Sequence, residues 1–182
     1  MTETAQSFDI VIIGAGPAGL SFARTLSDTG LNICLVERHP LKVLENPPED
    51  GRDIALTHTS EKLMKELGLW AHIPEDEIGV IRDAKVIDGV DPYALHFDSN
   101  ETGAPYLGKI VPNHLIRKAA YEAVKDLGNI TILTDKNVMQ VETDNAEGRV
   151  TLKDGSVEPP PHGDLGADDR FRSHRDRLRD EP

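Results

Sequence analysis

The segment FDIVIIGAGPAGLSFA, Phe8 to Ala23, carries the main information about the fold. A short β-branched apolar run leads into three closely spaced glycines, Gly14, Gly16 and Gly19, and apolar residues then resume at helical spacing. The run predicts a buried strand over 9–13, and the proline after the second glycine suits the first turn of a helix. Glycines placed where a strand leads into a helix are typical of a phosphate-binding turn.

The residues that follow complete a βαβ unit. Leu20, Ala23 and Leu26 continue one apolar helical face, and residues 32–37 predict a second buried strand. Cys34 lies inside that strand and is expected to be a buried, inert residue. Strand, helix and strand in this order indicate a parallel sheet.

Beyond this unit, helical and strand-like segments alternate. The expected elements are a loop over 39–52, a helix capped by Ser60 and closed by Gly68, short strands between 78 and 111, a helix over 112–128, a parallel strand over 130–133, and an antiparallel meander formed by 137–142 and 149–155. The predicted fold class is therefore α/β, with a Rossmann-like parallel sheet, an added β meander and a further β region over 80–111.

Composition limits the possible partners and locations. The 182 residues suffice for one ordinary domain, and a net charge of −12 opposes binding to nucleic acid. The first residues, MTETAQS, show no signal-peptide pattern, and no apolar stretch reaches transmembrane length, so a cytoplasmic protein is expected. A single cysteine cannot form an internal disulfide. The seven histidines lack metal-binding spacing, and no metal site is expected.

The glycine turn fits the pattern G-x-G-x-x-G from Gly14 to Gly19. In dinucleotide-binding folds these glycines allow a tight turn, close approach of the backbone to a pyrophosphate, and close packing of the helix on the strand. Glu37 ends the second strand about 20 residues later, where the fingerprint requires an acidic residue. Because a carboxylate there accepts hydrogen bonds from ribose hydroxyls and repels a 2′-phosphate, NADP is disfavoured, which leaves FAD or NAD.

Two later segments favour FAD. GRDIALTHTSEKLMKELGLW, Gly51 to Trp70, has an arginine before Ala-Leu and then a helix ending in Leu-Gly-Leu-Trp, and GKIVPNHLIRKAA spans Gly108 to Ala120. Together with the glycine turn, they resemble the FAD-dependent class A aromatic monooxygenases, in the branch that hydroxylates ubiquinone precursors, relatives of para-hydroxybenzoate hydroxylase. The resemblance implies an N-terminal FAD-binding domain over 1–157, with 80–111 as part of a substrate-facing β region.

The resemblance also implies a set of cofactor-binding residues: Gly14, Gly16, Ala18, Gly19, Glu37, Arg38, Arg52, Asn113 and Val138. The glycines would hold the FAD pyrophosphate, and Glu37 with Arg38 the adenosine ribose. Arg52 would lie along the pyrophosphate and the ribityl chain, where a guanidinium can meet phosphate oxygens in bidentate fashion. Asn113 would approach the flavin, with a plain helix cap as the alternative.

Other charged residues have ordinary explanations. The carboxylates of ENPPEDG, residues 45–51, stand in a proline-rich loop and are expected to be solvated. Arg117 would either face the cofactor, as in the family it resembles, or be a solvated charge on the helix.

The resemblance implies an enzyme in which NAD(P)H reduces FAD and one oxygen atom of O₂ is delivered to the ring of a polyprenyl phenol. Peripheral association with a membrane or a biosynthetic complex is implied as well. The family's second motif, an apolar strand before Ala-Asp-Gly, is echoed only by ADDR at 167–170, because PPPHGDLG replaces the strand. Residues 158–182 are polar and expected to be disordered, the family's C-terminal half is missing, and no catalytic residue is assigned.

Three functional hypotheses follow. The chain is a flavin monooxygenase by family, or it is a non-catalytic fragment that binds FAD or another dinucleotide, or it is an NAD-dependent enzyme of the Rossmann class. The segments that contain Arg52 and Asn113 disfavour the third hypothesis.

Overall fold

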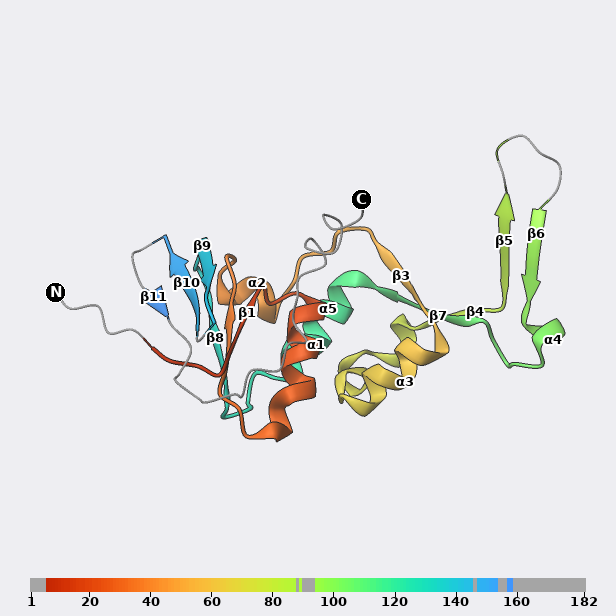
Figure 1. Ribbon diagram of the computed structural model, residues 1–182. Coiled ribbons are helices and arrows are strands. Elements are labelled where there is room, and N and C mark those ends of the chain that lie inside the picture. Colours follow the sequence, from red (N-terminus) through yellow and green to blue (C-terminus); the bar gives the residue numbers. More distant parts are fainter. Residues whose placement is uncertain (1–5, 88, 90–93, 146, 154–156, 159–182) are drawn as a thin grey trace, which may run out of the picture.

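The computed structural model describes residues 6–87, 89, 94–145, 147–153 and 157–158. The chain is elongated (Figure 1). A parallel sheet and its helices lie toward one end, a two-stranded antiparallel hairpin projects at the other, and a small antiparallel sheet lies between them.

The parallel sheet forms from the three segments predicted as strands over 9–13, 32–37 and 130–133, although the first, predicted as buried, is only partly buried and its Ile13 is 53% exposed. Its strands are β1 (Ile10–Ile13), β2 (Ile33–Val36) and β8 (Ile130–Leu133), in the order β1-β2-β8. β2 pairs in parallel with both neighbours, so that Cys34 lies opposite Val11 and Thr131. All four residues of β2 are buried, as a continuous apolar run predicts for a central strand. The α/β prediction and the buried position of Cys34 are confirmed.

Helix α1 (Pro17–Leu26) joins β1 to β2 and packs on the sheet through Leu20 and Ala23. Gly16 is its N-cap, and the proline takes the first helical position, where it has no N–H group to lose. After a short 3₁₀ turn, Gly30 has a φ of +80°, a left-handed conformation that ends the helical segment.

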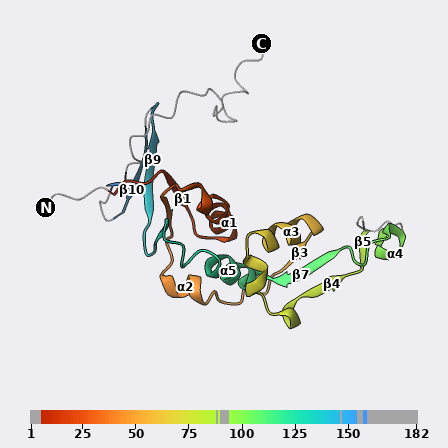
Figure 2. The same ribbon diagram turned by 90° about the horizontal axis from the view of Figure 1, so that it is seen from below.

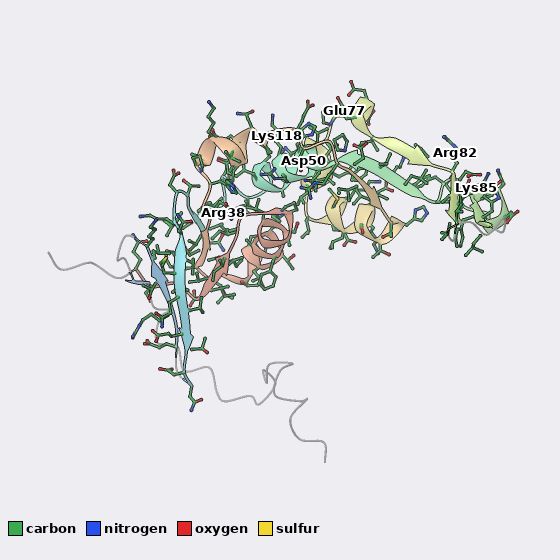
Figure 3. The ribbon with its side chains drawn as sticks, turned by 90° about the horizontal axis from the view of Figure 1, so that it is seen from above. Arg38, Asp50, Glu77, Arg82, Lys85 and Lys118 are labelled. Atoms are coloured by element: carbon green, nitrogen blue, oxygen red, sulfur yellow. The ribbon has the colours of Figure 1, made fainter. Side chains whose placement is uncertain are left out.

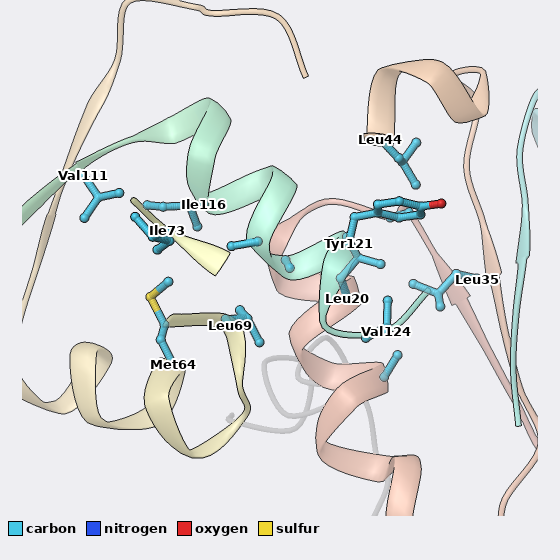
Figure 4. Close-up of a cluster of buried hydrophobic side chains, with 14 of the residues drawn as sticks. Leu20, Leu35, Leu44, Met64, Leu69, Ile73, Val111, Ile116, Tyr121 and Val124 are labelled. Atoms are coloured by element: carbon cyan, nitrogen blue, oxygen red, sulfur yellow. The ribbon is translucent and has the colours of Figure 1, made fainter. Parts of the chain in front are cut away.

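Helix α5 (Asn113–Glu122) lies beside α1 and forms much of the main core (Figure 4). The largest fully buried side chains of this core are Leu20, Ile33, Leu35, Leu69, Val111 and Val124. The helix is shorter than the predicted 112–128. Beyond Glu122 the chain tightens into turns, in which the Val124 N–H donates to the Tyr121 carbonyl three residues back, at 3.0 Å.

The prediction of a loop over 39–52 is wrong in part. Residues Leu41–Glu45 form the short helix α2, with Pro40 as its N-cap. Leu44 is buried in the main core and lies near Tyr121 of α5 (Figure 4). Burial of this leucine outweighs the loop-like composition of the segment.

The predicted cap of the next helix is also wrong. Helix α3 (His58–Glu66) has Thr57 as its N-cap, and the Thr57 hydroxyl accepts a hydrogen bond from the Ser60 N–H at 3.2 Å. The cap therefore lies three residues before Ser60. Gly68 follows the helix with a φ of +81°, as predicted for its C-terminal stop.

Thr57→Ala is expected to lower the free energy of unfolding by about 1 kcal/mol, because an orphan N–H group of the first helical turn loses its acceptor. The matched control is Thr59→Ala, which makes the same change two residues later, where threonine is exposed within the helix. That control is expected to be neutral or slightly stabilising, since alanine has the higher helix propensity. Urea unfolding compares the two variants, and equal losses would contradict the cap assignment.

A three-stranded antiparallel sheet lies beside α3. Its strands are β3 (Asp53–Leu56), β7 (Gly108–Pro112) and β4 (Gly79–Ile81), with β7 in the middle. β3 was not predicted, because four residues are too few to show a clear strand pattern of their own. Asp53 lies opposite Pro112, so the pairing brings the start of β3 next to the start of α5.

The projecting hairpin consists of β5 (Asp83–Ile87) and β6 (Ala94–Asp98), followed by the short helix α4 (Ser99–Thr102). Val86 pairs with Leu95 and Ala84 with Phe97, so these four residues share one face. Val86, Leu95 and Phe97 are 57%, 47% and 45% exposed. In the described part of the chain, this apolar face is left open to solvent.

The predicted meander is present as β9 (Val138–Thr143) and β10 (Gly148–Leu152), extended by β11 (Val157–Glu158). Figure 2 shows β9 and β10 on the side of β1 opposite α1. A second core, formed by Phe8, Cys34, Val36, Val150 and Leu152, joins the meander to the parallel sheet. The tail predicted for 158–182 begins inside β11, and its remaining residues, 159–182, lie outside the described part.

Candidate functional site

The glycine turn lies between β1 and α1, at the carboxyl end of the parallel strands. Gly14 has a φ of +101°, which an L-residue rarely adopts, and its N–H donates to the Val36 carbonyl at 2.8 Å. This hydrogen bond ties the turn to the end of β2. The carboxyl edge of a parallel sheet is where α/β folds place their ligands.

The other two glycines of the motif differ in what they require. A Cβ atom on Gly19 would lie 2.1 Å from the Gly14 carbonyl oxygen, so helix-to-strand packing excludes any side chain there. Gly16 has an ordinary extended backbone, with φ −79° and ψ 178°, and a Cβ atom there would meet nothing within 4 Å. The fold itself therefore needs Gly14 and Gly19, whereas Gly16 leaves a bare backbone facing open space.

That space lies at the N-terminus of α1. Among the described residues no side chain caps this helix, so the amide groups of its first turn, which includes Ala18, are left to other acceptors. The positive end of the helix dipole points the same way. The arrangement suits an anionic group such as a phosphate.

Glu37 follows β2 and is only 8% exposed. Its Oε2 accepts the Ala15 N–H at 2.8 Å, and its Oε1 accepts the His39 N–H at 2.9 Å and lies 2.6 Å from His39 Nδ1. Burial alone would raise the pKa of Glu37, but these hydrogen bonds outweigh it and hold the pKa below its usual value. The carboxylate is therefore charged at neutral pH. Its partners Ala15 and His39 were not predicted as site residues.

Two adjacent hollows meet at Glu37 and Arg38, and Figure 3 shows Arg38 near the parallel sheet. One, of about 200 Å³, is lined by Ala15, Gly16, Glu37, Arg38, His39, Val43, Leu44, Pro47 and Arg117. The other, of about 310 Å³, is lined by Ile13, Gly14, Val36, Glu37, Arg38, Lys136, Asn137 and Val138. The structure thus gathers five predicted residues, Gly14, Gly16, Glu37, Arg38 and Val138, around one region.

Arg52 and Asn113 form a second group, joined by Asp50. Arg52 donates to Asp50 Oδ2 from Nε at 3.1 Å and from Nη2 at 2.6 Å, and Asn113 Nδ2 donates to the same oxygen at 2.7 Å. The Asn113 N–H also donates to the Arg52 carbonyl at 2.8 Å. Asp50 remains accessible to solvent, as predicted for the carboxylates of 45–51, but it is also hydrogen-bonded, because the β3–β7 pairing brings Asn113 to the turn that holds Asp50 and Arg52.

Helix α5 links the two groups. Asn113 is its first residue and Pro112 holds the N-cap position, so the alternative role of Asn113 as a cap does not apply. Arg117, four residues later on the same helical face, lines the hollow beside Gly16. A third hollow, of about 250 Å³, is lined by Glu49, Gly51, Arg52, Asp53, Glu77, Pro112 and His114. One helix therefore places an arginine beside the glycine turn and an amide beside Arg52.

The residues present fit an extended dinucleotide. Glu37 is a charged acceptor suited to ribose hydroxyls, the start of α1 offers amide donors to phosphate, and Arg52, 67% exposed at its side chain, offers a guanidinium further along. The parallel sheet, the crossover helix and this site define an α/β dinucleotide-binding protein.

The chain belongs to the FAD-binding domain family, whose sequence pattern it matches over residues 7–159. It is 49% identical to the ubiquinone hydroxylase UbiM of Neisseria meningitidis, over 93% of this chain and 38% of that protein. It is 29% identical to the ubiquinone hydroxylase UbiL of Rhodospirillum rubrum, over 82% of this chain and 34% of that protein. The chain thus spans a little over a third of the length of these relatives.

Solved structures share the fold at lower identity. The p-nitrophenol 4-monooxygenase PnpA of Pseudomonas putida superposes with a TM-score of 0.65 at 16% identity, over 86% of this chain and 39% of that one. PqsL of Pseudomonas aeruginosa, a probable FAD-dependent monooxygenase, superposes with a TM-score of 0.63 at 21% identity, over 85% and 41% of the two chains. In the described part of this chain, none of the helices is long and apolar enough to cross a bilayer.

Proposed function

We propose that this chain is the FAD-binding part of an NAD(P)H-dependent monooxygenase that hydroxylates the aromatic ring of a ubiquinone precursor. The proposal rests on one observation: the backbone at Gly16, which has no side chain, faces an open hollow at the start of α1, next to the charged Glu37. The 49% identity to a ubiquinone hydroxylase supports the reaction class.

In this proposal the adenosine end of FAD lies at the two hollows that meet at Glu37. Glu37 accepts hydrogen bonds from the ribose hydroxyls, with Arg38 and Val138 beside it. The pyrophosphate lies over Gly14 and Gly16, where the first-turn amides of α1 meet its oxygens. Ala18 and Gly19 belong to that turn.

The other half of the cofactor lies toward the second group of residues. Arg52 pairs with the pyrophosphate and the ribityl chain, and Asn113 faces the flavin side. Arg117 lines the hollow beside Gly16, which supports a role along the cofactor rather than that of an isolated surface charge.

When bound, FAD supplies the oxidation–reduction chemistry: NAD(P)H provides two electrons, one oxygen atom of O₂ enters the ring, and the other leaves as water. The residues of this chain bind and orient the cofactor. The proposed substrate is a polyprenyl phenol. Because such a molecule dissolves in membranes, we also propose a cytoplasmic protein that associates peripherally with a membrane or a biosynthetic complex.

The proposal is tested with a chimera in which residues 7–158 replace the matching segment of the Neisseria relative. The expected result is a yellow protein that consumes NAD(P)H and O₂ and yields a hydroxylated polyprenyl phenol. A control chimera that carries Gly16→Val is expected to lack both flavin and activity. A flavin-free protein from the first chimera would refute the proposal.

FAD binding without hydroxylation is the second candidate function. The open apolar face of β5 and β6 favours it, because in the described part of the chain this face lacks the cover that a water-excluding substrate pocket requires. A chimera that binds FAD but hydroxylates nothing would favour this candidate. A flavin-free chain that binds NAD would favour an NAD-dependent enzyme.

Glu37→Ala is expected to weaken FAD binding by roughly 1.5–3 kcal/mol, about ten- to a hundredfold in Kd, because ribose hydroxyls lose a charged acceptor. The control is Glu142→Ala, which removes an exposed glutamate from β9. Fluorescence titration of FAD measures both variants, and an unchanged Kd for Glu37→Ala would exclude the ribose role.

The lowered pKa of Glu37 sets the pH dependence of the same contact. Because the pKa of Glu37 is lowered, its carboxylate stays charged while the pH falls through the usual pKa of a glutamate side chain, near 4.3. The Glu37 contribution to FAD affinity is therefore expected to be constant from about pH 5 to 8, and to be lost only below that range. Titrations of FAD at several pH values, with Glu37→Ala as the reference, check this.

A further inference from the structure

Asp50 joins two segments that are 63 residues apart in the chain. Its Oδ2 accepts three hydrogen bonds, two from the Arg52 guanidinium and one from the Asn113 amide, and its Oδ1 accepts the Arg52 N–H at 3.2 Å. The Asp50 side chain is 24% exposed, whereas that of Arg52 is 67% exposed. The Asp50 carboxylate is thus less exposed than its guanidinium partner, which remains open to a ligand.

The backbone fixes this geometry from both sides. Gly51 has a φ of +69°, which turns the chain sharply between Asp50 and Arg52. On the other side, the pairing of Asp53 with Pro112 sets the start of α5 beside this turn. Figure 3 shows Asp50 near the junction of β7 and α5.

The contacts leave donors of Arg52 available. Asp50 engages the edge of the guanidinium formed by Nε and Nη2, and among the described residues the Arg52 side chain donates only to Asp50. Nη1 is therefore available to a phosphate or a hydroxyl. A long side chain that is already held in one orientation loses less conformational entropy when it binds a ligand.

The charge of Asp50 is maintained by the same contacts. Hydrogen bonds from Arg52 first, and then from Asn113, hold the pKa of the Asp50 carboxyl well below its usual range. The bridge between the two cofactor-facing residues is therefore ionic across the physiological pH range.

We propose that Asp50 is a positioning residue for FAD, which holds the Arg52 guanidinium and the Asn113 amide ready along one stretch of the cofactor. This inference rests on the proposed function, since it requires that the chain binds FAD. Asp50 itself acts through its two partners and makes no contact with the cofactor.

The test compares FAD affinity with the stability of the apo chain. Asp50→Ala is expected to raise the Kd for FAD by about tenfold or more, as the loss of charge-assisted hydrogen bonds predicts. Asp50→Asn keeps the shape and loses the charge, so a smaller rise is expected, and Asp50→Glu should recover part of the affinity. The control, Asp126→Ala, removes an exposed aspartate beyond the far end of α5 and should leave the Kd unchanged.

A mutant cycle between Asp50 and its two partners, taken together, separates positioning from a merely structural role. In a chain that carries Arg52→Ala and Asn113→Ala, adding Asp50→Ala is expected to change the Kd by less than twofold, because the residues through which Asp50 acts are gone. A fall in apo melting temperature with an unchanged Kd, a tighter Kd, or fully additive effects would each overturn the inference. Absence of FAD binding by the unaltered chain would overturn the proposed function instead, and the inference with it.

Discussion

Gly16→Val is expected to abolish FAD binding, with a rise in Kd of at least about a hundredfold, while the chain stays folded. The backbone at Gly16 is extended, with φ −79° and ψ 178°, a conformation that valine adopts readily. Its Cβ atom would meet no neighbour within 4 Å, so the cost to folding is limited to a poorer N-cap, about 1 kcal/mol. The branched side chain would instead occupy the space proposed for the pyrophosphate, beside the amides of α1.

The control for this variant is Gly128→Val. Gly128 also has open space around its Cα and lies in the turn before β8, at the opposite edge of the parallel sheet. The Gly128→Val variant should bind FAD with the affinity of the unaltered chain. Absorbance of the bound flavin gives the stoichiometry, and far-ultraviolet circular dichroism reports the helix content. A Gly16→Val chain that purifies yellow at normal stoichiometry would show that the glycine turn serves packing alone.

Gly19→Ala is expected to prevent stable folding, even though it adds a single methyl group. The added Cβ atom would lie 2.1 Å from the Gly14 carbonyl oxygen and 3.3 Å from the Gly14 carbonyl carbon. These are backbone atoms of a turn that is tied to β2, so no side-chain rotation relieves the clash. Separating α1 from the sheet would cost several kcal/mol, on the order of the 5–15 kcal/mol by which domains are stable.

Gly16→Ala is the matched control for Gly19→Ala, since it makes the same change in the same turn without a clash. Urea unfolding of the apo chains, followed by circular dichroism, should show a small change for Gly16→Ala and a lost or strongly weakened transition for Gly19→Ala. Equal stability of the two variants would mean that α1 packs on β1 more loosely than the structure indicates.

The sequence alone predicted the parts of this protein that depend on local chemistry. The β-branched runs at 9–13 and 32–37 predict adjacent strands, and the glycine turn before a proline predicts a helix start. The position of Glu37 after the second strand then predicts a dinucleotide site. Each of these inferences rests on residues close together in the chain, where spacing and backbone preference limit the possible structures.

Tertiary structure decided what depends on contacts between distant residues. Asp50 was expected to be a solvated loop carboxylate; it is accessible to solvent, but it also bridges Arg52 and Asn113, because β3 pairs with β7. The distinction between Gly16, which faces open space, and Gly19, which is enclosed by Gly14, also depends on how α1 lies on the sheet. Residue type and spacing identify glycines and carboxylates, but only the packed chain determines which atoms meet them.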